Sequence, residues 1–455
     1  MTSTDRQPAA GRRGRTFAAG FASVAGWSFD LFDLFLVLYV SGPVSHLIFP
    51  SSQPTLSLAA VFASFAVSVL LRPLGAGIFG HYADQRGRKK TLVIVMTGVG
   101  VTTALMGLVP TYASAGLLAP VLFLLLRVVQ GVFVGGVVAA THTLGTESVA
   151  PKWRGLMSGL VGGGGSAIGA ALASLVYLAV SSAFPGAEFN VWGWRFMFFS
   201  GLLSAVLSYL VFLTVDESEE WKANAGAKKP HISMRALVTG PERSRFALNL
   251  ALTTGAGGLY YLTAGYLPTF LEQINHLDGT VKGNVLLAAN GVALVVAPLA
   301  GMASQRFGRR RTMITVGVAN LVATPLLLWH MSSLGSADVG AILLSVMLLG
   351  LVTGGGHAPV IAYLNERYPT ALRARGTAVC WNLGFMVGGL LPTFVSLASP
   401  ALSDIPSRLV MFIVAVVLVY LIANILSPET RSTDERLAPQ LDARVEQELT
   451  AEERV

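Results

Sequence analysis

The 455-residue sequence predicts an all-α membrane protein in which twelve transmembrane helices form two pseudo-symmetric bundles of six. Three observations lead to this prediction. Hydrophobic residues make up 53% of the chain and charged residues only 12%, whereas about 25% of the residues in soluble domains are charged. Twelve apolar stretches are long enough to cross a bilayer. A short basic motif occurs once in each half of the chain.

Six apolar stretches lie in the first half, each close to the roughly 20 residues that span a membrane. They are 17–40, 58–79, 91–110, 117–144, 156–180 and 195–215. The stretch 156–180 contains a run of glycines, which gives a helix a bare face for close packing against a neighbour. This run lies at membrane depth and lacks the Lys-Ser/Thr of a phosphate-binding loop, so it does not indicate ATP binding.

Six further stretches follow in the second half. They are 245–271, 283–303, 313–331, 339–363, 376–399 and 408–427. Deep inside these helices the sequence places no Asp, Glu, Lys or Arg. The pair Tyr260–Tyr261 beside Gly257–Gly258 favours an unwound segment that faces a cavity.

The distribution of Lys and Arg predicts the orientation, because cytoplasmic loops carry an excess of these residues. With the N-terminus inside, the cytoplasmic segments hold 27 of the 32 basic residues. The net charge of +8 therefore reflects topology and not a nucleic-acid surface. The predicted divisions are an N-terminal tail 1–16, a first half 17–215, a central loop 216–244, a second half 245–427 and a C-terminal tail 428–455. Both tails are expected in the cytoplasm, on a plasma (inner) membrane.

Two motifs are repeated at the same offset. The segment that begins at Gly80 reads GHYADQRGRKK, and its counterpart at Gly301 reads GMASQRFGRRR, 221 residues later. The Arg-Gly pairs Arg154–Gly155 and Arg375–Gly376 are also 221 residues apart. Two independent motifs at one offset indicate duplicated halves, which create a binding site at their interface near the bilayer midplane, with access alternating between the two sides.

These motifs resemble those of the major facilitator superfamily, over about residues 30 to 430. Further strings resemble its metabolite:proton symporter branch: FPSS from Phe49, LRPLG from Leu71, RVVQG from Arg127 and WGWR from Trp192. The pair Asp30-x-x-Asp33 is more similar to sialate and aromatic-acid symporters. The resemblance implies the major facilitator fold, transport of a small molecule, and no cofactor other than the proton as coupling ion. Gln85 and Gln305 depart from the basic residue and the Asp that the motif usually carries at these positions.

Charged residues inside a membrane are costly and indicate function. Asp30 and Asp33 share one face of the first helix, because they are three residues apart. Two neighbouring, partly dehydrated carboxylates favour proton uptake near neutral pH, which suits proton coupling. Arg127 lies roughly 15 Å deep at 1.5 Å per residue and is their expected partner. The alternatives are that one Asp only pairs with an arginine, and that Arg127 binds a substrate carboxylate bidentately.

The remaining candidates fall into two groups. Expected to contact the substrate are Arg72, Gln130, Tyr260, Tyr261, His357, Trp381 and Asn382. Arg72 precedes Pro73, so it either neutralises a buried acid or substrate anion, or bonds backbone carbonyls freed by a proline kink. Expected to form a cytoplasmic gate are Gly80, Asp84, Gly87, Arg88, Glu147, Arg154, Arg309, Glu366, Arg373 and Arg375.

The sequence therefore favours a secondary active transporter, not an enzyme, that imports a small organic anion such as a carboxylate together with protons. We expect a monomer in the lipid bilayer that binds no nucleic acid and no metal. One alternative is proton symport of a zwitterionic compatible solute such as proline or betaine. Another is a proton-antiport exporter of metabolites or drugs, for which 156–180 would be expected to carry Gly-x-x-x-Gly-Pro. A receptor that transports nothing is a third, but it would not need both repeated motifs.

Overall fold

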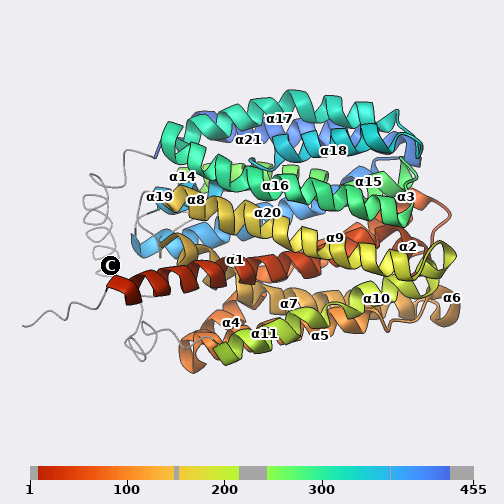
Figure 1. Ribbon diagram of the computed structural model, residues 1–455, viewed down its shortest axis with the longest axis horizontal. Helices are drawn as coiled ribbons and strands as arrows, with labels where there is room; N and C mark the ends of the chain where they lie inside the picture. The colour runs from red at the N-terminus through yellow and green to blue at the C-terminus, as the bar shows by residue number, and fades with distance from the viewer. Residues whose placement is uncertain (1–8, 148–152, 215–242, 369, 431–455) are drawn as a thin grey trace, which may run out of the picture.

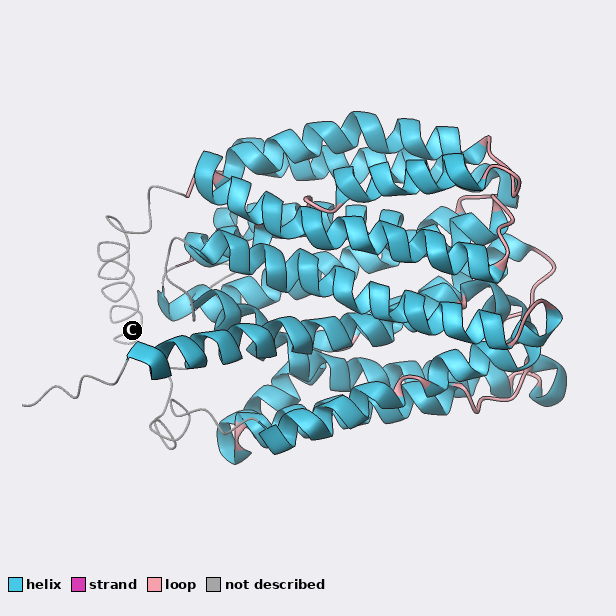
Figure 2. Ribbon diagram, viewed as in Figure 1, coloured by secondary structure: helices cyan, strands magenta, loops and turns pink. Residues whose placement is uncertain are grey.

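The computed structural model describes the chain except for residues 1–8, 148–152, 215–242, 369 and 431–455, and side chains are also left undescribed at scattered positions inside helices. Within the described residues the chain is helical and contains no strand (Figure 2). The long helices run side by side in one bundle, and α1 begins at the same end at which α21 ends (Figure 1). All twelve predicted stretches are helical, which confirms the fold class.

In the described part of the first half there are thirteen helical segments, and several of them follow one another directly as continuous longer helices. They are α1 (Ala9–Tyr39), α2 (Ser41–Leu47), α3 (Pro54–Leu70), α4 (Arg72–Arg86), α5 (Arg88–Met106), α6 (Tyr112–Ala115), α7 (Leu118–Glu147), α8 (Arg154–Ser158), the π-helical η2 (Gly159–Gly164), α9 (Gly165–Ala183), the π-helical η3 (Phe189–Gly193), α10 (Trp194–Phe199) and α11 (Leu202–Thr214).

The second half is also built of long helices with short interruptions. Its segments are α14 (Arg243–Tyr260), the π-helical η4 (Tyr261–Gly265), α15 (Leu267–Gln273), α16 (Gly279–Phe307), α17 (Arg309–Ser332), α18 (Val339–Thr353), α19 (Val360–Arg367), α20 (Thr370–Leu397), the 3₁₀ turn η5 (Leu402–Asp404) and α21 (Ile405–Leu426).

Seven helices of the described chain are by themselves long and apolar enough to span a membrane, and α1 with α2 makes an eighth although it bends by 55°. The other four predicted stretches are helical but shorter or interrupted. The helix of 245–271 passes through η4, and that of 339–363 is interrupted between α18 and α19 by the glycines Gly354–Gly356. Such irregular backbone is tolerated at membrane depth where neighbouring protein covers it. Tyr420 covers the interruption at Gly354–Gly356, because its hydroxyl donates to the Gly356 carbonyl at 2.8 Å.

Large apolar side chains cover the outside of the bundle. Leu117, Leu326 and Trp329 are each exposed by 65% or more. Soluble monomers rarely expose apolar patches of this extent, and a lipid environment accounts for them.

The two halves meet along two helix pairs. Helix α9 packs along α16 (Figure 1). Helix α3 packs along α20. When the transmembrane stretches are numbered in order, the first pair joins stretches five and eight, and the second pair joins stretches two and eleven. Exchanging the two halves therefore converts one pair into the other. This arrangement is what a duplicated unit produces when its copies pack face to face.

The repeated basic motif has one backbone shape in both copies. Gly87 ends α4 at φ 103°, and Gly308 ends α16 at φ 106°. Side chains disfavour this region of φ, so glycine is the residue that allows a sharp turn between two helices there. The 221-residue repeat is therefore a repeat of conformation as well as of sequence.

Candidate functional site

Two carboxylates lie one helical turn apart in the C-terminal third of α1. Asp30 is 5% exposed and Asp33 is 2% exposed, in a helix that packs against α7 and α9. Asp30 Oδ2 forms an ion pair with Arg72 Nη1 at 3.3 Å. Arg72 is the first residue of α4 and is followed by Pro73, directly after Leu71, where α3 ends. Of the roles considered for Arg72, the structure places it as the neutralising partner of a buried acid.

Arg127 is held by a different set of contacts. Its Nη1 donates to Gln130 Oε1 at 2.8 Å, and Gln130 Nε2 donates in turn to Thr103 Oγ1 at 2.7 Å. The two residues are three apart on α7, so their side chains meet on one face of the helix. Gln130 thus fixes the guanidinium of Arg127 and ties it to α5.

Several polar atoms of this charged group have no hydrogen-bond partner among the described residues. They are Asp30 Oδ1, Asp33 Oδ1, Arg72 Nε, Arg127 Nε and Arg127 Nη2. Asp33 lies within electrostatic reach of Arg127 and close to the hydroxyls of Thr103 and Ser204. The four charged residues and Gln130 line a cavity of about 10 Å³, close to the space that one water molecule needs.

An aromatic group borders the charges from the second half. Tyr260 and Tyr261 contact each other with ring centroids 5.4 Å apart, and Tyr260 lies 5.0 Å from the His357 ring. Trp381 stacks on Phe385 at 4.2 Å and meets Trp27 of α1 edge to face at 6.0 Å. The rings come from α1, α14, η4, α20 and the interruption between α18 and α19, so both halves contribute.

Two polar atoms in this aromatic group also lack a described hydrogen-bond partner. They are the Tyr260 hydroxyl and His357 Nε2, on residues 9% and 6% exposed. Asp30 lies within electrostatic reach of both tyrosines, which joins the aromatic group to the charged group. Asn382 differs, because its Nδ2 donates to Ala378 O of its own helix at 2.8 Å.

Some residues of this site were not predicted. Trp27, Thr103, Ser204 and Phe385 line it, but their chemistry alone does not distinguish them from packing residues. Trp27 had one available signal, since it precedes Asp30 by three residues and therefore shares its helix face.

The predicted cytoplasmic gate is described in the second half. Arg309 Nη2 lies 2.8 Å from Glu366 Oε1, and Arg309 Nε also donates to Glu366. Thr430 Oγ1 donates to Glu366, and the Glu429 carboxylate accepts from the backbone N–H of Arg309 at 2.8 Å. This places a carboxylate at the N-terminus of α17, where the helix dipole favours negative charge.

The remaining predicted gate residues, in both halves, are described only in part. The side chains of Asp84, Arg88, Glu147, Arg373 and Arg375 lie outside the described part of the structure. A Cβ on Gly80 would have no neighbour within 4 Å, so no close packing requires this glycine in the present conformation. Arg154 is half-buried, and the following Gly155 packs against α16, where its Cβ would lie 2.5 Å from Gly301 O.

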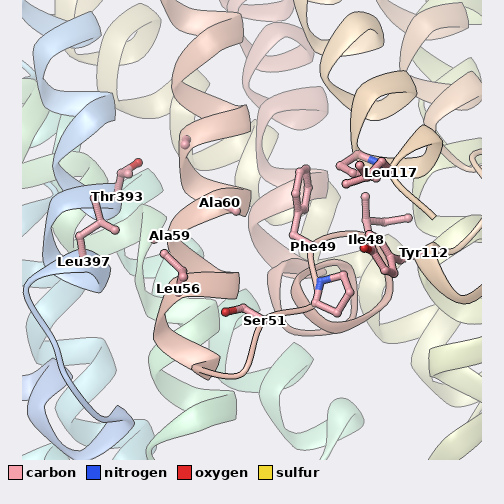
Figure 3. Close-up of a pocket in the computed structure, with 13 residues that line it drawn as sticks. Ile48, Phe49, Ser51, Leu56, Ala59, Ala60, Tyr112, Leu117, Thr393 and Leu397 are labelled. Carbon is pink, nitrogen blue, oxygen red and sulfur yellow. The ribbon is translucent and has the colours of Figure 1, made fainter.

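A larger cavity, of about 480 Å³, shares no lining residue with the small charged one. Figure 3 shows the residues that line it. It lies between the start of α3, the end of α20 and the α2–α3 turn, with Leu56, Thr393 and Phe49 among its walls. Because no charged residue lines it, it does not offer the chemistry of proton coupling.

Comparison with known proteins gives a consistent result. The model of the Major Facilitator Superfamily matches residues 16–297 and 250–448. The inner membrane metabolite transport protein YhjE of Escherichia coli is 30% identical over 82% of this chain and 86% of its own. The proline/betaine transporter of Salmonella typhimurium is 28% identical, over 82% and 76% of the two chains. The citrate-proton symporter of Klebsiella pneumoniae is also 28% identical, over 80% and 81%.

Solved structures show the same fold. A crystal structure of a D-xylose-proton symporter superposes with a TM-score of 0.72 at 17% identity, covering 91% of this chain and 98% of the other. The xylose transporter XylE of E. coli in a partially occluded, inward-open conformation gives a TM-score of 0.69, also at 17% identity, covering 92% and 99%. At this level of identity the likeness concerns the fold alone.

Proposed function

This chain belongs to the major facilitator superfamily, and we propose that it is a proton-coupled symporter that imports a small organic anion. It is a multi-pass membrane protein and a secondary transporter of a small molecule, not an enzyme. The observation that carries the proposal is the arrangement of Arg127, which has two donors without a hydrogen-bond partner among the described residues and lies within electrostatic reach of Asp33. The positive-inside bias supports a cytoplasmic position for both termini.

The charges of the site suggest how protons and anions are coupled. Arg72 and Arg127 balance Asp30 and Asp33, so the charged group is neutral as a whole. A proton that binds Asp33 from the outer water leaves one uncompensated positive charge in a dry site, which is unfavourable. A substrate carboxylate restores neutrality, so proton and anion each strengthen the binding of the other. Release of the proton to the inner water then expels the anion.

The geometry of Arg127 suits a carboxylate. Its Nη1 is engaged by Gln130, which leaves Nε and Nη2, the two donors along one edge of the guanidinium. Two parallel donors of this kind donate to both oxygens of one carboxylate. The present cavity of about 10 Å³ is too small for such a group, so binding requires the surrounding helices to rearrange.

A second candidate is a zwitterionic compatible solute. Trp27, Tyr260, Trp381 and Phe385 surround the same site with aromatic rings, and such rings attract quaternary ammonium groups. A betaine-like molecule would place its carboxylate at Arg127 and its cationic end among these rings. The similarity to proline/betaine transporters supports this candidate, and the similarity to a citrate-proton symporter supports the first.

The test is uptake into proteoliposomes with an imposed pH gradient, across a panel of carboxylates and betaine-like solutes. We expect one compound to accumulate when the outside is acidic, and the proposal fails if none does. The membrane potential distinguishes the two candidates. A monoanion that enters with one proton moves no net charge, so its accumulation is insensitive to a potassium diffusion potential. A zwitterion that enters with one proton carries one positive charge, so an interior-negative potential raises its accumulation.

A further inference from the structure

Lys282 is a buried cation for which the sequence suggested no role. It lies in the first turn of α16 and is 1% exposed. Its Nζ lies 2.5 Å from Glu272 Oε2, at the end of α15. Both residues belong to the second half, so this ion pair does not depend on where the first half lies.

The ammonium group of Lys282 also reaches the first half. Its Nζ donates to the backbone carbonyl of Tyr39 at 3.4 Å and lies 4.5 Å from the centre of the Tyr177 ring. Tyr39 is the last residue of α1, where the chain bends by 55° into α2. Carbonyls at the end of a helix lack intrahelical partners, and Lys282 supplies one.

Other contacts between the halves surround this point. The hydroxyls of Ser41 and Thr269 lie 2.7 Å apart. A Cβ on Gly42 would lie 1.8 Å from Glu272 Oε1, so the close approach of α2 to Glu272 requires glycine. Helix α16 also contacts Tyr39 at a second point. Two turns beyond Lys282, the Asn290 Nδ2 donates to the Tyr39 hydroxyl at 3.2 Å.

We propose that Lys282 is the residue that holds the two halves together at the predicted outer side. This inference rests on the chain being a transporter but not on the identity of its substrate. Opening on this side separates Lys282 from the Tyr39 carbonyl and the Tyr177 ring. It leaves the Lys282–Glu272 pair intact, so no buried charge loses its partner and the movement remains reversible. Tyr39 is the last residue of α1, the helix that carries Asp30 and Asp33. The contact between Lys282 and Tyr39 therefore acts directly on this helix.

The experiment measures thiol accessibility without substrate and without a pH gradient. The single cysteine is removed by Cys380→Ala, and Leu38→Cys is introduced as the reporter. Leu38 is 1% exposed and faces the second half, 3.7 Å from the position of a Cβ on Gly265. A membrane-impermeant maleimide is applied to the outside of intact cells. Lys282→Met is expected to raise the labelling rate about tenfold or more, as loss of a hydrogen bond to a charged group implies.

Two further variants make the result decisive. Arg408→Met removes an exposed cation that is also predicted to lie outside, and it is expected to leave labelling unchanged. The double variant Lys282→Met/Glu272→Gln has no unpaired buried charge, so it provides the measurement if the single variant folds poorly. Raised labelling in the double variant supports the proposal. Labelling at the parental rate in the double variant overturns it, because Lys282 would then serve only to neutralise Glu272.

Discussion

Replacing Asp33 with asparagine separates proton coupling from substrate binding. Asparagine resembles protonated Asp33 in size and charge, and it keeps an oxygen and an amide for Thr103 and Ser204. Arg127 keeps its bond to Gln130, so the variant reproduces the charge of one natural step of the cycle. We therefore expect Asp33→Asn to fold and to bind substrate.

The magnitude follows from the number of available acids. Asp30 is held by Arg72, which leaves Asp33 as the one acid of this site without an ion pair at hydrogen-bonding distance among the described residues. With one proton per cycle, each unit of pH difference corresponds to about 1.4 kcal/mol and to roughly tenfold accumulation of a monoanion. The variant is expected to reach equal concentrations on both sides, whatever the pH gradient.

The assay compares two modes in the same proteoliposomes, accumulation under an inward acid gradient and counterflow exchange at equal pH. Asp33→Asn should lose accumulation and keep exchange. Equal loss of both would refute the reasoning and assign Asp33 to binding or folding. The matched control is Asp30→Asn, which strands Arg72 in a buried site at a cost of about 3–5 kcal/mol and should impair both modes. The double variant Asp30→Asn/Arg72→Gln should recover folding.

Three further predictions concern the close packing at Gly301, the positioning of Arg127 by Gln130, and the ion pair between Arg309 and Glu366. Gly301→Ala places a Cβ 2.2 Å from Gly155 O, whereas Gly291→Ala on the same helix meets nothing within 4 Å. Overpacking of about 1–3 kcal/mol should therefore slow transport about tenfold in the first variant and not in the second, as initial uptake rates will show. Gln130→Leu removes a bond to the charged Arg127, about 1.5–3 kcal/mol, and should raise the KM about tenfold or more, while Thr103→Val removes only a neutral bond and should raise it less. Equal effects would mean that Gln130 does not position Arg127. Glu366→Gln leaves Arg309 without its counter-charge and should lower the midpoint of thermal unfolding, which an unchanged midpoint would contradict.

Much of the fold could be predicted because the membrane permits few solutions. Backbone groups in hydrocarbon have to be bonded within their own segment, so an apolar stretch of about 20 residues is a helix. The two copies of the basic motif gave the duplication, and Gly87 and Gly308 adopt the same backbone conformation. The predicted twelve helices were less regular than the hydropathy suggested. Glycine and proline interrupt several of them, and hydropathy averaged over a stretch does not register such interruptions.

The candidate site was predicted in composition, and its pairing only in part, because neutralisation of a buried acid was one of the roles considered for Arg72. The sequence identified Asp30, Asp33, Arg72 and Arg127 because charges are rare in apolar stretches. It made Arg127 the expected partner of the acids, whereas the structure pairs Asp30 with Arg72 and ties Arg127 to Gln130. Partners on different helices depend on helix rotation and on the break at Leu71, and neither can be read from spacing along one helix.

By itself the sequence determined that this chain is a duplicated bundle of membrane helices and which few charges it buries. These properties follow from local composition and from the repeated motif, and both can be read from the sequence without knowledge of tertiary contacts. Only the tertiary structure decided which charge neutralises which, that aromatic rings from both halves border the acids, and that Lys282 joins α16 to the end of α1. Such contacts join residues far apart in the chain, 243 positions in the case of Lys282 and Tyr39, and their energies depend on the distances that packing of the two halves creates.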